Sequence, residues 1–221
     1  MKSSGIVLDM KRYYSPDDTA PPAATWYDTS RFGTDGTITT ATWARQASGL
    51  YALDFNSATP DYVEVTCPQC NFTSEDFSVV GRVKIDSLAT YRTVFCRGVV
   101  NADGYYWLIY PTGVIQFLTS QSAALQSTVT ATGAVTTGVN YTLGVTRSGT
   151  SVLLYVNGEL PTQTPASHTN PLTSARTGKV GIQDNKSTYP FDGLISHLTV
   201  YSRALSAGEH KNIHESLVRY G

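Results

Sequence analysis

Acidic residues are the first candidates for chemistry, because glycoside hydrolysis needs an acid and a base or nucleophile held roughly 5 to 9 Å apart. Glu64 and Glu159 each stand alone in the sequence, and no Glu-x-Asp-x-x-Glu cluster occurs. Glu75 and Asp76 are neighbours, and neighbouring residues of a strand point to opposite faces of a sheet. The sequence therefore predicts a protein that is not an enzyme.

Cysteine and histidine are the other candidate reactive groups. The stretch Cys67-Pro-Gln-Cys70 is half of a zinc site, but a closed site needs four ligands, and only Cys96 and four scattered histidines could complete it. The favoured interpretation is that these thiols lie in or beside a loop, and whether they form a disulfide stays open. His210 and His214 could share a metal ion on one face of a helix, yet no glutamate-based hydrolase motif surrounds them.

The charge balance argues against two classes of partner. The chain has 16 Lys and Arg residues against 17 Asp and Glu residues, a net charge of -1, so no basic face for nucleic acid is indicated. No run of 18 apolar residues that could enter a membrane is present, and the apolar run that starts at Ile6 is far too short for a signal peptide. We therefore expect synthesis in a cytoplasm without a signal peptide.

Alternating apolar residues predict many short strands that would position these groups. The clearest pattern is a hairpin at 141–156, followed by an Asn157-Gly158 turn and a third, short strand from Glu159. The longest alternation, 76–86, places Val83 on a buried face and predicts a central strand. The strands at 49–56 and 61–65 are expected to form a hairpin. Further strands are expected at 6–8, 91–98, 105–110, 114–118, 126–131, 178–182 and 194–201.

One helix is expected, at the C-terminal end. Ser206 and Glu209 form a capping box, in which each side chain accepts a hydrogen bond from the backbone N–H of the other residue. His210, Ile213, His214 and Leu217 then follow helical spacing, so one stripe should lie on the sheets. Near the other end, Asp28 and Ser30 are suited to bonding nearby backbone N–H groups in an ordered loop.

Six short motifs occur in an order that resembles a known family. They are Asp28-x-Ser30 with Gly33 and Gly36-Thr-Ile38, Trp43, 52–55 with 61–65, 154–159, 191–195 and 200–206. Together they resemble the laminin-G-like, concanavalin A-like jelly-roll domains. The resemblance implies an all-β fold, a two-sheet antiparallel jelly-roll β-sandwich with one concave sheet, and we expect a short C-terminal helix and a single domain over residues 1–221.

The same resemblance raises the question of calcium, which some family members hold at the rim of the sandwich. Family members often carry acidic residues where this chain has Ser196 and His197. Asp9 and Asp192 remain as candidate ligands, although a solvated or turn-capping carboxylate is the favoured interpretation for both. We therefore expect no cofactor, with calcium as the alternative.

Two functions fit these features. The first is a non-catalytic structural or adhesion module on a virion or other extracellular particle, such as a capsid decoration or tail-associated protein that works as a homo-oligomer or lattice. It is favoured because 11% aromatic and only 15% charged residues suit repeated self-contacts. The alternative is a carbohydrate-binding, lectin-type module. Its candidate sugar-stacking residues are Trp26, Tyr105, Tyr106 and Trp107, although a role as core and strand-surface residues is the favoured interpretation for them.

Overall fold

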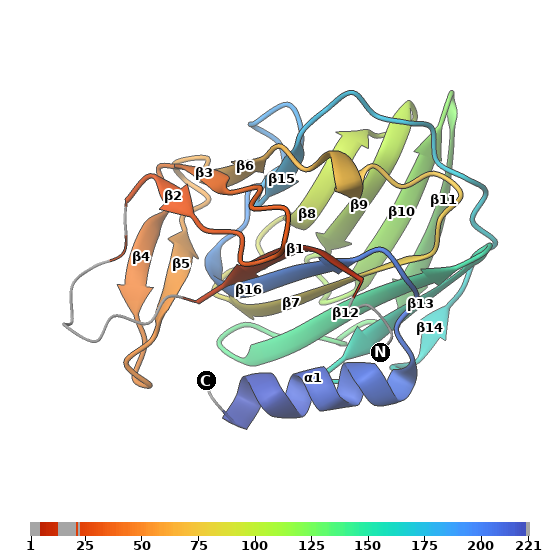
Figure 1. The fold of residues 1–221 in the computed structure, drawn as a ribbon. Coiled ribbons are helices and arrows are strands. Elements are labelled where there is room, and N and C mark those ends of the chain that lie inside the picture. The colour runs from red at the N-terminus through yellow and green to blue at the C-terminus, as the bar shows by residue number, and fades with distance from the viewer. Residues whose placement is uncertain (1–4, 13–20, 22, 220–221) are drawn as a thin grey trace.

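Two antiparallel sheets stacked face to face form the body of the computed structural model, which describes residues 5–12, 21 and 23–219 (Figure 1). We call them the first and the second sheet. Both bury apolar side chains toward each other, so a single hydrophobic cluster lies between the layers. The expected all-β sandwich with a C-terminal helix is confirmed.

The first sheet has the strand order β13-β12-β7-β16-β5-β4, with β1 paired to β16. Its strands are β1 (Ile6–Lys11), β4 (Thr42–Arg45), β5 (Tyr51–Phe55), β7 (Phe77–Ile85), β12 (Asn140–Ser148), β13 (Ser151–Val156) and β16 (Gly193–Tyr201). Strand β7 lies between β12 and β16, which confirms that it is central. Its alternating residues Phe77, Val79, Val83 and Ile85 are at most 1% exposed, as the alternation predicts.

The second sheet has the strand order β14-β11-β10-β9-β8-β15-β6-β3-β2. Its strands are β2 (Thr25–Trp26), β3 (Gly36–Thr39), β6 (Tyr62–Val65), β8 (Arg92–Val99), β9 (Asp103–Ile109), β10 (Ile115–Gln121), β11 (Ala124–Thr130), β14 (Gln163–Thr164) and β15 (Gly178–Val180). A short 3-10 turn, η1 (Pro68–Cys70), follows β6. The successive strands β8 to β11 pair as a meander (Figure 1).

Two expectations about turns need correction. Strands β5 and β6 do not form a hairpin, because β5 pairs with β4 and β16 while β6 pairs with β3 and β15. The segment between them carries the chain from one sheet to the other. The Asn157-Gly158 turn forms as expected, with φ of 52° and 80°, but the strand expected after it is reduced to one bridge between Val156 and Glu159.

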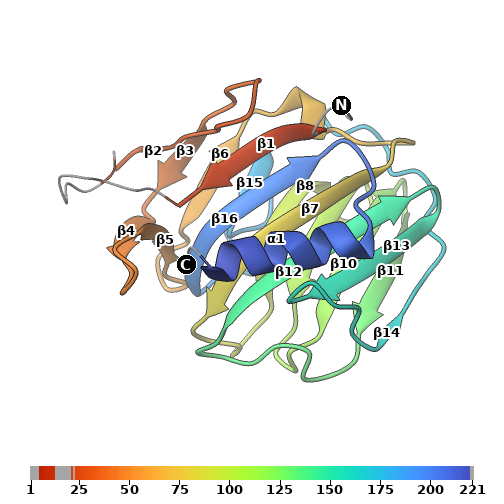
Figure 2. The same cartoon turned by 60° about the horizontal axis from the view of Figure 1, so that its bottom comes forward.

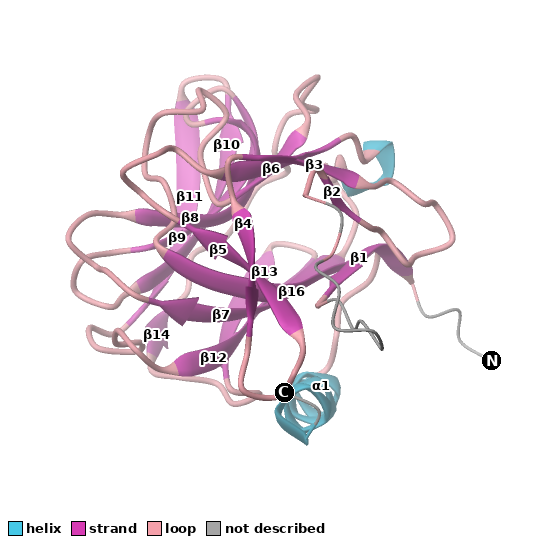
Figure 3. Cartoon of the chain, turned by 90° about the vertical axis from the view of Figure 1, so that its left-hand side faces the viewer, coloured by secondary structure: helices cyan, strands magenta, loops and turns pink. Residues whose placement is uncertain are grey.

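Helix α1 (Ala207–Arg219) lies against the outer face of the first sheet (Figures 2 and 3). The capping box is present: the Ser206 N–H donates to Glu209 Oε2 at 2.9 Å, and the Glu209 N–H donates to Ser206 Oγ at 3.3 Å. His210 and Leu217 are buried on the side that faces the sheet. In the part of the chain that the structure describes, no helix is long and apolar enough to span a membrane.

Candidate binding site

The four aromatic residues expected to stack on sugars lie in the interior. Trp26, Tyr105 and Trp107 are 1% exposed and Tyr106 is 2% exposed. Alternation in β9 turns Tyr105 and Trp107 toward the other sheet, while Tyr106 packs on the outer side with Cys96, Leu108 and Leu118. None of the four offers a ring face to a ligand, so the expected stacking role is corrected to a role in packing.

The two candidate calcium ligands, Asp9 and Asp192, already have partners. Asp9 accepts hydrogen bonds from Thr29 and Thr199, both at 2.9 Å, and its Oδ2 lies 2.7 Å from the Lys11 ammonium. Asp192 accepts a hydrogen bond from the Ser57 hydroxyl, and its Oδ2 lies 3.6 Å from the Arg92 guanidinium. Neither donor set fits calcium, which needs several oxygen ligands rather than a cation beside one carboxylate. Across the described residues, no group of three or more His, Cys, Asp or Glu side chains could hold a metal ion.

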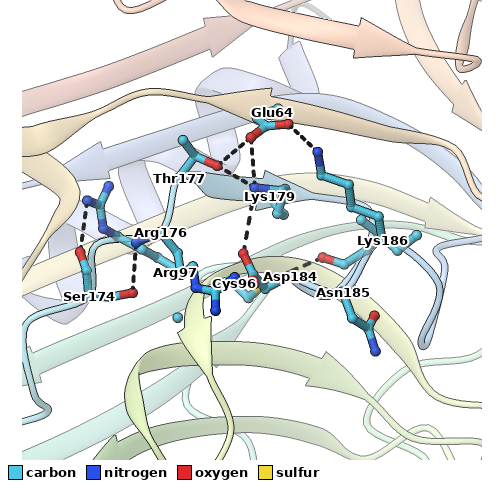
Figure 4. A network of polar contacts seen from close by, with 12 residues as sticks. Glu64, Cys96, Arg97, Ser174, Arg176, Thr177, Lys179, Asp184, Asn185 and Lys186 are labelled. Carbon is cyan, nitrogen blue, oxygen red and sulfur yellow. Dashed lines mark hydrogen bonds and ion pairs between the residues drawn. The ribbon is translucent and has the colours of Figure 1, made fainter.

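Glu64, one of the isolated acidic residues, is the centre of a polar network on the second sheet (Figure 4). Its carboxylate lies 3.1 Å from the buried Lys179 ammonium and 2.9 Å from Lys186, and it accepts a hydrogen bond from Thr177 at 2.7 Å. Burial opposes ionisation, but the hydrogen bonds from Lys186, Thr177 and Lys179 outweigh it and lower the pKa of Glu64 to about 2. Such a carboxylate stays ionised and is a poor proton donor at neutral pH.

The other three acidic residues considered for catalysis also serve the fold. Glu75 accepts a hydrogen bond from the Thr73 N–H at 2.8 Å, and this bond is the main cause of its lowered pKa. Asp76 accepts from the Gly149 N–H at 2.7 Å, and Glu159 lies 3.1 Å from Lys211. Each carboxylate has a separate structural partner, as expected for turn and surface residues.

The cysteines and the helix histidines do not converge on a metal site. Cys67 and Cys70 form a disulfide across η1, whereas Cys96 is a buried free thiol whose pKa is raised by burial. His210 Nε2 is hydrogen-bonded to the Thr146 hydroxyl at 2.8 Å, and His214 Nδ1 to the Thr142 hydroxyl at 3.0 Å. Both histidines therefore dock α1 onto β12.

Three other tyrosines form a partly exposed group, which we call the tyrosine cluster: Tyr91, Tyr110 and Tyr189. Tyr91 precedes β8, Tyr110 follows β9, and Tyr189 lies in the loop that leads to β16. The Tyr91 ring centroid is 4.6 Å from that of Tyr110, with the rings edge to face at 71°, and 4.8 Å from that of Tyr189. The cluster thus brings three aromatic rings together at the ends of two adjacent strands.

Backbone contacts hold the cluster in place. Tyr189 has a left-handed φ of 53°, which costs an L-residue about 1–2 kcal/mol and persists only where the surroundings enforce it. Its carbonyl accepts a hydrogen bond from the Thr93 N–H at 2.9 Å, and Arg92 Nη1 donates to the next carbonyl, that of Pro190, at 2.9 Å. Burial raises the pKa of Tyr110, so its hydroxyl stays protonated at neutral pH. The result is a fixed, uncharged aromatic surface.

Part of this cluster has a signal in the sequence. Tyr106 and Leu108 share one face of β9 by alternation, and Tyr110 continues this spacing directly after the strand, before the turn at Pro111. The contact of Tyr189 with Tyr91 has no such signal, because it depends on where a distant loop folds back. The sequence therefore indicates one ring of the three.

Solved structures of similar fold are found among toxin binding domains. The botulinum neurotoxin serotype D binding domain matches with a TM-score of 0.71 and 16% identity over 96% of this chain and 52% of that one. The botulinum neurotoxin serotype G binding domain matches with a TM-score of 0.72 and 13% identity over 96% and 51%. The binding domain of Paraclostridial Mosquitocidal Protein 1 matches with a TM-score of 0.72 and 12% identity over 96% and 52%. This chain spans about half the length of each of these structures.

A family model identifies the family, whereas the similar structures show only the fold. No curated protein matches the chain. The family model described as the concanavalin A-like lectin/glucanases superfamily matches residues 57–209, which is more than half of the 221 residues. That range includes β6 to β16 and the tyrosine cluster. The chain therefore belongs to the concanavalin A-like lectin/glucanases superfamily.

Proposed function

We propose that the protein is a non-catalytic binding module that recognises a glycan through the tyrosine cluster. The observation that carries this proposal is the group of three partly exposed rings held in contact by a strained, hydrogen-bonded loop. Tyrosine offers an apolar ring for the C–H face of a sugar and a hydroxyl for its polar rim, at a low cost in side-chain entropy. A glycan is the proposed partner because its surface combines the same apolar and hydroxyl groups.

The chemistry of the cluster favours an uncharged sugar. Burial raises the pKa of Tyr110, and the nearby Tyr91 raises it further. The cluster therefore presents neutral hydroxyl donors. Gln116 lies close to Tyr110, and its side-chain amide donates to Ser127 at 2.6 Å. A single aromatic surface of this size corresponds to weak binding, on the order of 1 mM or about 4 kcal/mol, so several copies would be needed for firm attachment.

The similar structures support the coarser part of the proposal. They are binding domains, and another similar structure is the receptor binding domain of botulinum neurotoxin D. Their low identity supports a shared fold rather than a shared ligand. A binding role without catalysis is consistent with the structural partners of Glu64, Glu75, Asp76 and Glu159.

A glycan array probed with multivalently displayed protein tests the proposal. We expect the wild-type protein to bind a neutral sugar, and Tyr189→Ala and Tyr110→Ala each to weaken binding about tenfold or more. Tyr27→Ala is the matched control, because Tyr27 is 47% exposed and stands outside the cluster. Absence of glycan binding by the wild-type protein, or an equal loss in the Tyr27 variant, would contradict the proposal.

A second candidate is a structural or adhesion protein that works as repeated copies on a virion or another assembly. It is favoured by two exposed leucines beside Ser120: Leu125 pairs with Ser120 across β10 and β11, and the Leu172 N–H donates to the Ser120 carbonyl at 3.1 Å. Leu125 is 41% exposed and Leu172 is 47% exposed, so they offer apolar area for a contact between copies. Sedimentation of the wild-type protein and of the Leu172→Lys variant tests this role. The wild-type protein should form an oligomer whose population rises with concentration, and the substitution should disrupt that oligomer.

A further inference from the structure

A groove lies where helix α1 covers the outer face of the first sheet, on the side of the molecule away from the second sheet. The groove consists of two adjoining cavities that share Arg12 and Leu50 as lining residues. The larger cavity, about 560 Å³, lies between α1, β16 and β1. The smaller cavity, about 180 Å³, lies beside the 46–50 turn and the outer face of β7.

Two arginines line the smaller cavity, and neither forms an ion pair with another residue that the structure describes. Arg12 Nη2 donates to the Leu217 carbonyl at 3.3 Å, and Arg82 Nη1 donates to the Thr142 hydroxyl at 3.3 Å. Among the salt bridges between described residues, none involves either arginine. Burial lowers the pKa of Arg82, and the nearby Arg12 lowers it further. Two partly buried guanidinium groups that repel each other form a site suited to a shared anion.

The other charged residues that line the groove are already neutralised. Lys84 lies 2.8 Å from Asp86, and Lys11 lies 2.7 Å from Asp9. His197 is 8% exposed, and burial is the main cause that lowers its pKa to about 4, so it is uncharged at neutral pH. Among the described residues that line the groove, the unbalanced positive charge therefore lies on Arg12 and Arg82.

The larger cavity is mainly apolar. Ile213 and Leu217 of α1 face it from one side, and Ile6 of β1 and Tyr201 of β16 face it from the other. Its volume lies within the range of about 300–1,000 Å³ that is usual for small-molecule sites, whereas the smaller cavity has room for one small group only. The two cavities meet at Arg12, so a single ligand could occupy both.

We propose that this groove binds a small anionic amphiphile, with its oxyanion between Arg12 and Arg82 and its apolar chain against Ile213 and Leu217. The oxyanion supplies the charge that the two guanidinium groups lack, and the chain fills the apolar cavity. The site is separate from the tyrosine cluster, which lies at the ends of β8 and β9 in the other sheet. Its ligand is therefore independent of the proposed glycan.

Calorimetry with octyl sulfate, used below its micelle-forming concentration, tests the proposal. We expect octyl sulfate to bind at least about tenfold more tightly than either 1-octanol or inorganic sulfate, because each of these supplies half of the interactions. Arg82→Gln should weaken octyl sulfate binding about tenfold, the size expected from losing one charge-assisted hydrogen bond. Ile213→Ala should weaken octyl sulfate binding but leave the weak binding of inorganic sulfate unchanged.

Arg31→Gln is the matched control, since it removes the same charge from an exposed arginine that stands over Phe32, outside the groove. It should bind octyl sulfate as the wild-type protein does, and thermal melting should show that every variant remains folded. Glycan binding should be unaffected by Arg82→Gln, which separates this site from the tyrosine cluster. The proposal is overturned if octyl sulfate does not bind, if 1-octanol or inorganic sulfate binds equally well, or if Arg31→Gln causes the same loss as Arg82→Gln.

Discussion

Three buried histidines should make the stability of this fold depend steeply on acid. His168 is 0% exposed, His210 is 2% exposed and His197 is 8% exposed. Burial is the main cause that lowers the pKa of each to about 4. His168 is held by threonine hydroxyls on both ring nitrogens, at 2.9 and 3.0 Å, and the His210 ring is stacked on Tyr155 at 3.8 Å. Burial removes the water that would solvate a charged ring, so each site favours the neutral imidazole.

The sign and size of the effect follow from the difference between folded and unfolded pKa values. An unfolded histidine has a pKa of about 6.5, so between about pH 6.5 and 4 the unfolded chain binds protons that the folded chain does not. Stability is therefore complete above pH 6.5 and falls as the pH decreases. At about pH 5 each histidine removes about 2 kcal/mol, and the three together about 6 kcal/mol, which is comparable with the whole stability of a typical domain.

Urea unfolding at about pH 7.5, 6 and 5 measures this loss directly. Carboxylates with lowered pKa, such as Glu64 and Glu209, contribute only as the pH falls below about 4.5, so they do not obscure the result. His168→Gln should reduce the loss between the first and last condition by about 2 kcal/mol, even though it lowers stability at neutral pH. A change smaller than about 2 kcal/mol in the wild-type protein over this range would refute the reasoning.

Four further substitutions or assays have definite expected results. Val83→Asp should prevent folding, because Val83 is 1% exposed and an unpaired carboxylate there costs several kcal/mol; soluble protein that melts cooperatively would contradict this. Gly181→Ala should lower the Tm by several degrees, since Gly181 has a φ of +83° and a Cβ would lie 2.5 Å from the Phe55 ring. Tyr189→Gly should be more stable than Tyr189→Ala by about 0.5–1 kcal/mol in denaturant unfolding, because only glycine relieves the left-handed conformation; the reverse order would show that the loop imposes no strain. Incubation with β-glucans should release no sugar, and turnover lost on replacing Glu64, Glu75 or Glu159 would disprove that expectation.

The alternation of apolar residues predicts which side of each strand is buried but not which sheet the strand joins. Leu53, Phe55, Val63 and Val65 are all at most 1% exposed, as their spacing predicts. However, β5 and β6 bury these residues from opposite sheets, and a strand in either layer of a sandwich has the same pattern. The prediction of a hairpin at this position was wrong for that reason. The capping box of α1 was predictable because all of its contacts are local.

The candidate site was less predictable than the fold. Tyr105, Tyr106 and Trp107 are consecutive aromatics, which made them conspicuous, yet two face the core and the third is covered on the outer side of its sheet. The tyrosine cluster instead gathers single residues from the start of β8, the end of β9 and a loop before β16. Such a group depends on long-range contacts, which neither local spacing nor composition can predict.

The disulfide between Cys67 and Cys70 bears on the order in which the protein folds and oxidises. The loop that it closes is so short that the lost chain entropy of the unfolded state contributes only about 2 kcal/mol to stability. The turn is held independently, because Arg97 donates to the Cys67 carbonyl and Tyr105 donates to the Cys70 carbonyl, each at 2.8 Å. Since the carbonyls stay anchored when the sulfurs are separate, the chain can reach its native topology first and acquire the bond afterwards. The turn therefore does not depend on the disulfide alone, and loss of this bond should leave the sandwich folded.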